Sequence, residues 1–289
     1  MDKLLENFTI ARRLPSERDQ NFLVIDDSGQ QFVLKIANAS ESRVFLEAQN
    51  AVLDYLSERV SFCQRVIGEI MEHDGHFVRL VTYLPGVPLA EIKPHTSGLL
   101  QDFGQKLGQL SRALADFDHP AVHRDFHWDL ANGNRIIDQY SSLIEDSDLR
   151  ELVLKCRFEP ATELRRSVIH GDANDYNVLV DPDTMTVSGL IDFGDMVYSY
   201  TVNDLAIAIA YVVLGTGDPR DVIAGYTSEF PLLEDEREAL WPLVRLRLAM
   251  SVCMAAYQIK REPENEYLGI SQKAIEKTLP RMFTDEDTD

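Results

Sequence analysis

The sequence predicts an α+β protein of two lobes, in which an antiparallel sheet with one helix is followed by a mostly helical second lobe. Residues 22–37 and 66–84 each read as two short, mostly apolar strands joined by a polar turn that contains glycine, which is typical of hairpins. Residues 40–60 and 100–117 instead repeat apolar side chains at intervals of three and four, which is the period of a helix. A chain of 289 residues is also long enough to divide its core between two lobes.

The amino-acid composition limits the kinds of molecule that we expect the protein to bind. Lys and Arg number 28 against 48 Asp and Glu, and the resulting net charge of −20 argues against nucleic-acid or anionic-membrane partners. The same charge mildly favours a cationic substrate. Three cysteines lie far apart and form no CxxC motif, so we expect a reducing cytoplasm. Met1 to Glu6 shows no signal-peptide pattern, and the longest apolar run, Leu205 to Leu214, is shorter than the ~20 residues that a membrane span requires.

The first two expected strands, Phe22–Asp26 and Gln30–Ala37, are joined by an Asp-Ser-Gly turn typical of a hairpin. In the second strand the period of two places Val33, Lys35 and Ala37 on one face. A lysine among apolar neighbours is unfavourable unless its ammonium meets an anion. We therefore expect Lys35 to bind an anionic group, and a solvent-facing strand lysine is the alternative.

An amphipathic helix is expected over residues 40–60. Glu47 lies on this helix, and we expect its carboxylate to pair with Lys35. Glu41 is a competitor for that role, but it lies in the first turn, where an acidic residue complements the helix dipole without a further purpose.

A second strand pair follows, with Val66–Met71 and His76–Leu84 as its strands. The Pro-Gly pair within Thr82–Gly86 then breaks the pattern. We place a hinge there, so that residues 1–84 form the first lobe and residues 85–289 the second.

Two acidic loops carry the main functional signal. Val168–Val180 reads as strand, polar loop and strand, and Ile191–Asp195 reads as a second polar loop. Asp172 is followed by Asn177 five residues later, as in the catalytic loop of kinases, and the Asp-Phe-Gly that begins at Asp192 matches their metal-binding loop. Either motif alone is weak, because an Asp on a loop is usually a turn or cap residue. Together, in this order and between apolar strands, they are specific.

These residue types suit phosphoryl transfer from a nucleotide. A carboxylate at Asp172 would accept or orient the proton of an attacking hydroxyl group. The amide oxygen of Asn177 and the carboxylate of Asp192 would hold the Mg²⁺ that neutralises the triphosphate. The sequence therefore predicts a nucleotide-dependent phosphotransferase with Asp172 as its base.

The expected nucleotide contacts come from the first lobe. Lys35, fixed by its helix carboxylate, is expected on the α and β phosphates. The backbone of the hinge at Tyr83 and Leu84 could read the edge of adenine or guanine. No GxGxxG precedes Lys35, and the corresponding turn, Leu14–Asn21, contains no glycine. Its backbone amides and Ser16 could still contact phosphate, so the role of this loop stays open.

A second kinase-like tripeptide, His123-Arg124-Asp125, is interpreted as a coincidence. Its plus-five position is Leu130, which cannot bind magnesium, and no Asp-Phe-Gly follows at the required distance. Three histidines of this segment recur every four residues, but a zinc-binding helix would carry an acidic residue where Arg124 stands. We expect no metal there.

The acceptor is expected to be small. Only about a dozen residues separate the metal loop from the apolar helix over residues 205–214, whereas protein kinases place a longer activation segment there that ends in Ala-Pro-Glu. Asn203 and Asp204 look like the N-cap of that helix. Helices expected at Asp218–Phe230 and Glu234–Glu262 would wall the cleft.

The candidate substrate contacts are Asp195, Tyr198, Trp128 and Asp129, the last two also as possible helix caps. Trp241, Arg245, Arg247 and Tyr257 are further possible contacts, although core or surface roles are favoured for them.

The segment His170–Asn177, together with Ile191–Asp195, resembles the aminoglycoside phosphotransferase/choline kinase superfamily. Protein kinases have Arg where this chain has Gly171. Within the superfamily, Ser16–Phe22 is similar to the hydroxylysine kinase branch, which also lacks the glycine-rich loop. The resemblance covers nearly the whole chain, with further matching positions in the expected order at Lys35, Glu47, Thr82–Gly86 and Asp204.

This resemblance implies a protein-kinase-like bilobal fold and an ATP- or GTP-dependent kinase of a hydroxylated amine, such as hydroxylysine, an amino alcohol or an aminoglycoside. It implies Asp172 as base, Asn177 and Asp192 as magnesium ligands, and Lys35 with Glu47 at the phosphates. The superfamily changes acceptors by altering helices and loops around a shared core, so the acceptor, the choice of ATP or GTP and the oligomeric state stay open.

Two hypotheses compete with a small-molecule kinase. A non-catalytic member of the same fold would bind a nucleotide or metabolite for regulation, which the missing glycine-rich loop allows. Such a binding protein would not need the base at Asp172. A protein kinase is disfavoured by the short segment after Asp195.

Overall fold

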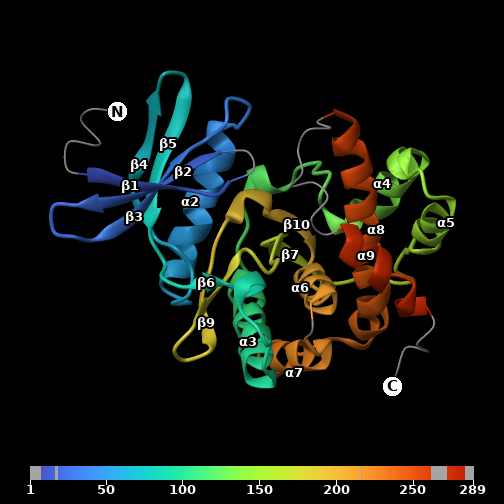
Figure 1. Cartoon of the computed structure of the whole chain (residues 1–289). Coiled ribbons are helices and arrows are strands. Elements are labelled where there is room, and N and C mark those ends of the chain that lie inside the picture. Colours follow the sequence, from blue (N-terminus) through green and yellow to red (C-terminus); the bar gives the residue numbers. More distant parts are fainter. Residues whose placement is uncertain (1–7, 17–18, 216, 262–271, 284–289) are drawn as a thin grey trace.

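The computed structural model describes residues 8–16, 19–215, 217–261 and 272–283. A twisted sheet with one helix lies on one side of the molecule and most of the helices lie on the other, with two small sheets between them (Figure 1). The α+β class expected from the sequence is confirmed, with the antiparallel sheet first and the helices mostly later.

The first sheet has five antiparallel strands in the order β1-β2-β3-β5-β4. Its two faces follow the period of two that the sequence shows. Phe32 and Leu34 pack with apolar side chains of neighbouring strands, whereas Val33 joins the main core through the opposite face. The strands are β1 (Phe8–Leu14), β2 (Gln20–Asp26), β3 (Gln31–Ile36), β4 (Val66–His73) and β5 (His76–Thr82).

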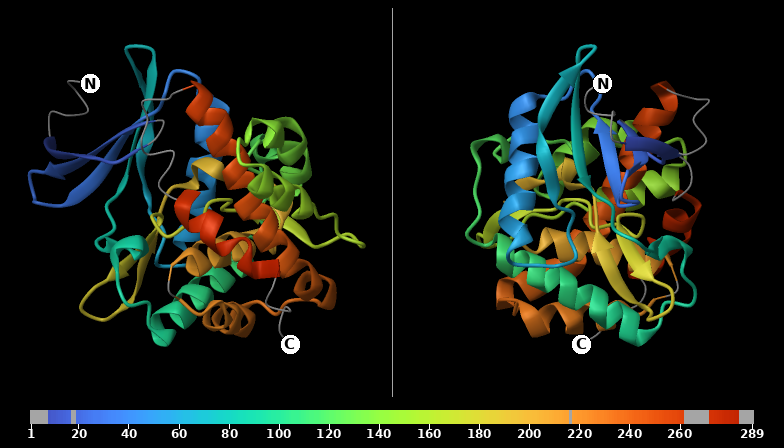
Figure 2. Two further views of the ribbon diagram at one scale, coloured as in Figure 1. Left: turned by 45° about the vertical axis from the view of Figure 1, so that its right-hand side comes forward. Right: turned by 90° about the vertical axis from the view of Figure 1, so that its left-hand side faces the viewer.

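Helix α2 (Arg43–Ser57) covers the face of the sheet that carries Val33. Its first turn is capped by Ser42, whose Oγ accepts a hydrogen bond from the Phe45 N–H at 3.2 Å. Phe45 and Val52 are buried on the side of the helix that packs into the core. Figure 2 shows the helix beside the strands from two further directions.

Two small sheets carry the acidic loops. One contains β6, β8 and β9, and the other pairs β7 with β10. The N–H of Leu190 donates to the Phe62 carbonyl at 2.8 Å, which ties β9 to the segment after α2. The bounds are β6 (Val87–Pro88), β7 (Arg166–Ile169), β8 (Val178–Asp181), β9 (Thr186–Leu190) and β10 (Val197–Tyr200).

The second lobe is mostly helical, as expected. Helix α6 is buried almost all round, and α8 packs along it, so the two form the centre of this lobe. The helices are α3 (Ser97–Leu114), α4 (Gly133–Tyr140), α5 (Ser147–Lys155), α6 (Asn203–Leu214), α7 (Pro219–Glu229), α8 (Glu234–Arg261) and α9 (Gln272–Thr278). Single 3₁₀ turns occur at Leu89–Glu91, Pro120–Val122, Leu130–Asn132, Ser141–Leu143, Phe193–Asp195 and Arg281–Phe283.

Helix α8 was not recognised in the sequence as a membrane-length segment. Within the described part of the chain it is the one helix long and apolar enough to cross a membrane by length and composition. The most apolar 18-residue stretch of α8 is 72% buried inside the protein. Its apolar surface is therefore used in the core of the second lobe.

The structure adds elements that the sequence pattern did not reveal. Strand β1 precedes the first expected strand, and α4 and α5 form in a stretch for which no element was predicted. The expected helices at Asp218–Phe230 and Glu234–Glu262 are confirmed as α7 and α8, apart from Glu262, which lies outside the described residues. β5 ends at Thr82, close to the expected hinge; the division between residues 84 and 85 stays a prediction.

Helices α3 and α7 approach each other through glycines. A Cβ at Gly104 of α3 would lie 2.1 Å from the carbonyl oxygen of Val222, and a Cβ at Gly225 of α7 would lie 2.0 Å from that of Gln101. Both contacts are with backbone, which cannot rotate away as a side chain can. The close crossing of these helices therefore requires glycine at both positions.

We predict that Gly104→Ala lowers the free energy of unfolding by about 1–3 kcal/mol, the usual effect of overpacking a tight contact. Gly98→Ala on the same helix is the matched control, because a Cβ there meets nothing within 4 Å. It should leave stability unchanged or raise it by up to ~1 kcal/mol through better helix propensity. Urea unfolding of the two variants checks this, and equal stabilities would contradict the close contact.

Candidate active site

A glycine brings the two acidic loops into contact. Gly171 follows β7 with a φ of +79°, a left-handed conformation that glycine adopts at little cost. A Cβ at this position would lie 2.5 Å from the carbonyl oxygen of Asp195. The loop that carries Asp172 is thereby packed directly against the loop that carries Asp192.

Asp204, in the first turn of α6, fixes the backbone of the same loop. Its Oδ2 accepts the N–H of His170 at 2.9 Å and its Oδ1 accepts the N–H of Gly171 at 2.8 Å. Burial raises the pKa of the Asp204 carboxyl, and His170 and the two N–H groups lower it. The expected N-cap role of Asn203 and Asp204 is wrong, because Val202 occupies the cap position without a side-chain bond. Asp204 instead positions the loop that precedes Asp172.

The carboxylate of Asp172 is bonded to two amides. Its Oδ2 accepts from Nδ2 of Asn174 and from Nδ2 of Asn177, both at 2.8 Å. The Asn177 amide also donates to the backbone carbonyl of Asp172 at 2.9 Å. These bonds engage the amide nitrogen of Asn177, so its amide oxygen is the atom left to serve as a ligand.

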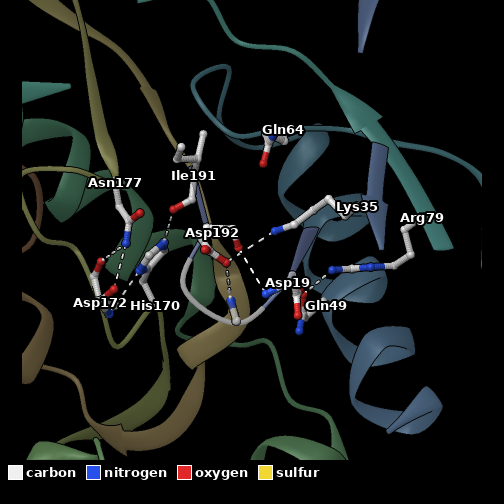
Figure 3. Close-up of polar contacts among 12 residues, drawn as sticks. Asp19, Lys35, Gln49, Gln64, Arg79, His170, Asp172, Asn177, Ile191 and Asp192 are labelled. Carbon is white, nitrogen blue, oxygen red and sulfur yellow. Dashed lines mark hydrogen bonds and ion pairs between the residues drawn. The ribbon is translucent and has the colours of Figure 1, made fainter. Parts of the chain in front are cut away.

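Asp172 shares its surroundings with the other acidic loop. Burial, and next the charge of Asp195, raise the pKa of the Asp172 carboxyl; the charge of Asp192 acts in the same direction, and Arg247 opposes it. The Asp172 side chain nevertheless keeps 23% of its surface exposed, so a ligand can reach it. The structure thus brings Asp172, Asn177 and Asp192 to one place, as Figure 3 shows.

Asp192 reaches from the second lobe to the first. It has a φ of +68°, which is unusual for a residue other than glycine. Its Oδ1 accepts the Gly194 N–H at 3.2 Å and lies 3.5 Å from Nζ of Lys35 (Figure 3). The carboxylate keeps 48% exposure, whereas the lysine side chain keeps 11%.

His170 links the two loops in the core. Its Nδ1 accepts the N–H of Asp172 at 3.2 Å, and its Nε2 lies 3.0 Å from the carbonyl oxygen of Ile191. Because a carbonyl only accepts, the ring carries its proton on Nε2. The ring also meets Phe193 edge-on, with 4.7 Å between centroids. A shift of either loop would therefore be transmitted to the other.

The expected ion pair between Lys35 and Glu47 is wrong in this structure. Oε1 of Glu47 accepts from Nε of Arg43, 2.9 Å away and one helical turn earlier, and both side chains are about half exposed. Glu47 therefore lies on the solvent side of α2, while Phe45 and Ala48 face the core. The acidic partner of Lys35 is Asp192.

Arg79 is a second cation at this position, and sequence analysis missed it. It lies directly opposite Lys35 across β3 and β5, and is 4% exposed. Its guanidinium donates to Gln49 at 2.5 Å and to Asn50 at 3.0 Å, both neutral amides of α2. Burial lowers its pKa, and the charges of Asp192, Asp19 and Glu41 raise it. Figure 3 shows Arg79 beside Lys35 on the same side of the sheet. The signal that could have revealed Arg79 was its position on β5, where it pairs across the sheet with the largely buried Lys35 of β3.

Arg124, the central residue of the rejected tripeptide, supports the metal loop. It donates to the carbonyl oxygens of Gly194 at 3.0 Å and Met196 at 3.1 Å. Its guanidinium also lies over the ring of Phe45 on α2, at 3.8 Å. That this tripeptide is not catalytic stays a prediction, and its arginine joins the first lobe to the second acidic loop.

The four candidate substrate contacts have different surroundings in the structure. Asp195 lies near Asp172, because its carbonyl oxygen closely approaches the neighbouring Gly171. Tyr198 stacks on His123 at 4.4 Å, and the ring of Trp128 lies under Arg247. Asp129 is 8% exposed and caps a 3₁₀ turn while accepting from Ser199. The alternative role of Asp129 as a cap is therefore confirmed, and it replaces the expected substrate contact.

The remaining expected nucleotide contacts lie at the edge of the first lobe. Ser16 is exposed and its Oγ accepts the Asp19 N–H at 3.3 Å. Glu17 and Arg18 of the same loop lie outside the described residues. Tyr83 and Leu84 are partly buried after β5, and Leu84 packs beside Gly189 of β9. Their contacts with a nucleotide stay predictions.

Of the further residues on α8, Arg247 proves to be part of the site. Nη2 of its guanidinium lies 3.2 Å from Oδ1 of Asp172. Arg245 instead bonds the carbonyl of Met282, and Tyr257 stacks on Tyr140. The contact of Arg247 spans 75 residues of sequence, so no local pattern could reveal it.

Asn177 and Asp192 offer oxygen atoms of the kind that Mg²⁺ takes as ligands, and their role as its ligands stays a prediction. Mg²⁺ prefers oxygen ligands and is often bound by one or two protein groups together with phosphates. Throughout the described ranges, no group of three or more His, Cys, Asp or Glu side chains could hold a metal. An amide oxygen and one carboxylate are a donor set that suits a metal shared with a nucleotide.

Comparison with known proteins adds a family to this geometry. Residues 10–240 match the model of the family described as "Phosphotransferase enzyme family". The chain is 36% identical to the hydroxylysine kinase of Mus musculus over 316 residues, which cover 93% of this chain and 83% of that protein.

Solved structures confirm the expected protein-kinase-like bilobal fold. The structure of an amicoumacin kinase in complex with AMP-PNP, Ca²⁺ and its ligand superposes with a TM-score of 0.70 at 14% identity, covering 96% of this chain and 89% of that one. A microcompartment-associated aminopropanol kinase gives a TM-score of 0.66 at 18% identity, covering 96% and 93%.

We predict that Asp204→Ala destabilises the protein by about 2 kcal/mol or more, because each buried N–H left without an acceptor costs ~1–3 kcal/mol. Exposed Asp183 supplies the control Asp183→Asn, which should stay within ~0.5 kcal/mol of wild type. Urea unfolding measures both. A wild-type unfolding midpoint for Asp204→Ala would show that the loop backbone does not depend on this carboxylate.

Proposed function

The chain belongs to the phosphotransferase enzyme family, and on this premise we propose that it transfers the γ-phosphate of ATP or GTP to a hydroxyl group of a small amine-bearing metabolite. It is a phosphotransferase with an alcohol group as acceptor, as its family and its similarity to hydroxylysine kinase establish. A purely regulatory binding role is not retained. Among acceptors we favour hydroxylysine, with amino alcohols and aminoglycosides as alternatives.

The observation that carries this proposal is the meeting of the two acidic loops. Asp172 and Asp192 come from loops that contact each other at Gly171 and through His170. Asn177 bonds Asp172 directly, so the expected base and both expected metal ligands share one site. A phosphoryl-transfer site needs these groups within reach of one phosphate.

In the proposed reaction Asp172 accepts a hydrogen bond from the acceptor hydroxyl and takes its proton as the oxygen attacks. The bonds from Asn174 and Asn177 hold the carboxylate at Oδ2 and keep its orientation fixed. His170 and Asp204 hold the backbone on which Asp172 stands. Fixed geometry of this kind is the main contribution a protein makes to phosphoryl transfer.

Lys35 and Arg79 are the proposed phosphate-binding cations. Like charges directly opposite each other on neighbouring strands repel, and both side chains are largely buried. The α2 groups that meet Arg79 are neutral amides, so a nearby anion would relieve this repulsion. Two cations on the sheet also offer phosphate contacts where the glycine-rich loop is missing.

Asn177 and Asp192 are the proposed ligands of Mg²⁺, which when bound would neutralise charge on the nucleotide phosphates. The acidic chain, with a net charge of −20, supports a cationic acceptor. The cytoplasmic location expected from the cysteines stays a prediction.

We predict that Asp172→Asn retains nucleotide binding but lowers turnover by about 10²–10⁴-fold, because a positioned general base is lost. Production of ADP or GDP in the presence of acceptor measures turnover, and calorimetry measures binding.

Asp192→Ala should instead abolish magnesium-dependent nucleotide binding. Asp183→Asn again serves as the control, with both properties unchanged. Comparable turnover by Asp172→Asn would remove this residue from the mechanism, and unchanged affinity of Asp192→Ala would remove it from the metal site.

A nucleotide-consumption screen tests the acceptor class. We predict turnover with hydroxylysine above that with ethanolamine, choline, fructosamines or aminoglycosides, with homoserine as a second hydroxylated amino acid. Each acceptor is offered with ATP and with GTP. Activity with none of them would contradict the proposed function.

A further inference from the structure

Arg247 occupies an unusual position beside the proposed base. Its side chain is 4% exposed in the middle of α8, and Nη2 lies 3.2 Å from Oδ1 of Asp172 and 3.4 Å from the hydroxyl of Tyr211. Among the described residues, the carboxylate of Asp172 is the only one within ion-pair distance of the Arg247 guanidinium. The role inferred below for Arg247 rests on the proposed kinase function of the site.

The hydrogen-bonding capacity of Arg247 is largely unused. Its Nε and Nη1 are buried and have no hydrogen-bond partner among the described residues. A guanidinium carries five N–H donors, and buried polar groups in proteins are rarely left unbonded. A buried donor without a partner destabilises the fold, and the free-energy cost is larger for a charged donor than for a neutral one. A buried arginine that bonds Asp172 through one nitrogen and leaves its other two without a partner indicates a missing anionic group.

The two oxygens of Asp172 show on which side that partner binds. Oδ2 faces Asn174 and Asn177, which is the side of the expected metal and nucleotide. Oδ1 faces Arg247, on a helix of the second lobe. The phosphate-binding cations Lys35 and Arg79 lie on the strands of the first lobe. Arg247 therefore lies on the acceptor side of the base.

Aromatic rings hold the guanidinium in place. Its central carbon lies 4.8 Å from the ring centroid of Trp128 and 5.9 Å from that of Tyr211. The neighbouring residues Leu246 and Leu248 are buried, so the helix cannot easily rotate. A planar, fixed guanidinium is well suited to a planar carboxylate, which accepts two N–H bonds at once.

We propose that Arg247 binds the carboxylate of the acceptor, so that the acceptor is a hydroxylated amino acid rather than an amino alcohol or an aminoglycoside. The carboxylate docks beside Asp172 and places the side-chain hydroxyl on the base. A purely cationic acceptor would leave Nε and Nη1 without a partner and would add a like charge beside the guanidinium. Arg247 is thus a specificity-determining residue that acts through substrate binding.

Matched acceptor pairs test this without any variant. Hydroxylysine is compared with its decarboxylated diamine, 1,5-diaminopentan-2-ol, and homoserine with 3-aminopropan-1-ol. We expect kcat/KM to favour the carboxylate-bearing member of a phosphorylated pair by at least about 100-fold, because a site built for a polar group discriminates strongly against its absence. Equal kcat/KM within the pair overturns the inference.

Variants then assign the preference to the residue. Arg247→Met should lower kcat/KM for the amino acid by about 100-fold or more, mostly through KM, and should affect the decarboxylated partner much less. Arg247→Lys should restore part of the preference, since it keeps the charge without the fork of donors. Arg245→Met, two residues earlier on the same helix, is the control and should retain the wild-type preference.

The outcomes separate this inference from the proposed function. Phosphorylation of amino alcohols or aminoglycosides at equal or higher efficiency overturns the role of Arg247 but leaves the kinase function intact. Equal losses for both members of a pair in Arg247→Met and Arg247→Lys also overturn it, because the arginine would then act only on Asp172 or on the fold. Absence of turnover with every hydroxylated amine overturns the proposed function itself, and the inference with it.

Discussion

The site depends on two hydrogen bonds that join the buried carboxylate of Asp204 to the backbone N–H groups of His170 and Gly171. They fix the one stretch of backbone on which the other contacts depend. His170 then reaches Ile191 and Phe193 in the second loop, and Gly171 allows that loop to come close. Because each contact constrains the next, the geometry of the proposed base and metal ligands is set from inside the second lobe, before any substrate binds.

The site combines its acidic loops with three cations, although the whole chain is strongly acidic. The protein carries a net charge of −20, yet three cations, Lys35, Arg79 and Arg247, lie largely buried at its centre. Their partners are neutral amides, or the acidic residues that the proposed chemistry itself requires. Arg79 bonds neutral amides, and Arg247 keeps two buried nitrogens without a partner, which is unfavourable in a resting protein. They become favourable when phosphates and an acceptor carboxylate supply the missing negative charge.

The sequence predicted the features that depend on local pattern. The period of two in β3 placed Lys35 on the correct face, and the spacing of Asp172, Asn177 and Asp192 indicated a shared site. The sequence failed where local signals are ambiguous or contacts are distant. A helix carboxylate can face either sheet or solvent, and Glu47 faces Arg43. An Asp at a helix start reads as a cap although Asp204 bonds a different segment. The roles of Arg79 and Arg247 arise only from tertiary packing.

In the proposed function, both acidic loops serve a single nucleotide and a single acceptor. A crystal structure of the protein with Mg²⁺, a non-hydrolysable ATP or GTP analogue and hydroxylysine tests it most directly. We expect the metal between Asn177 and Asp192, phosphates at Lys35, and the acceptor hydroxyl against the carboxylate of Asp172. A nucleotide bound away from these two loops, or an acceptor whose hydroxyl does not reach Asp172, would contradict it.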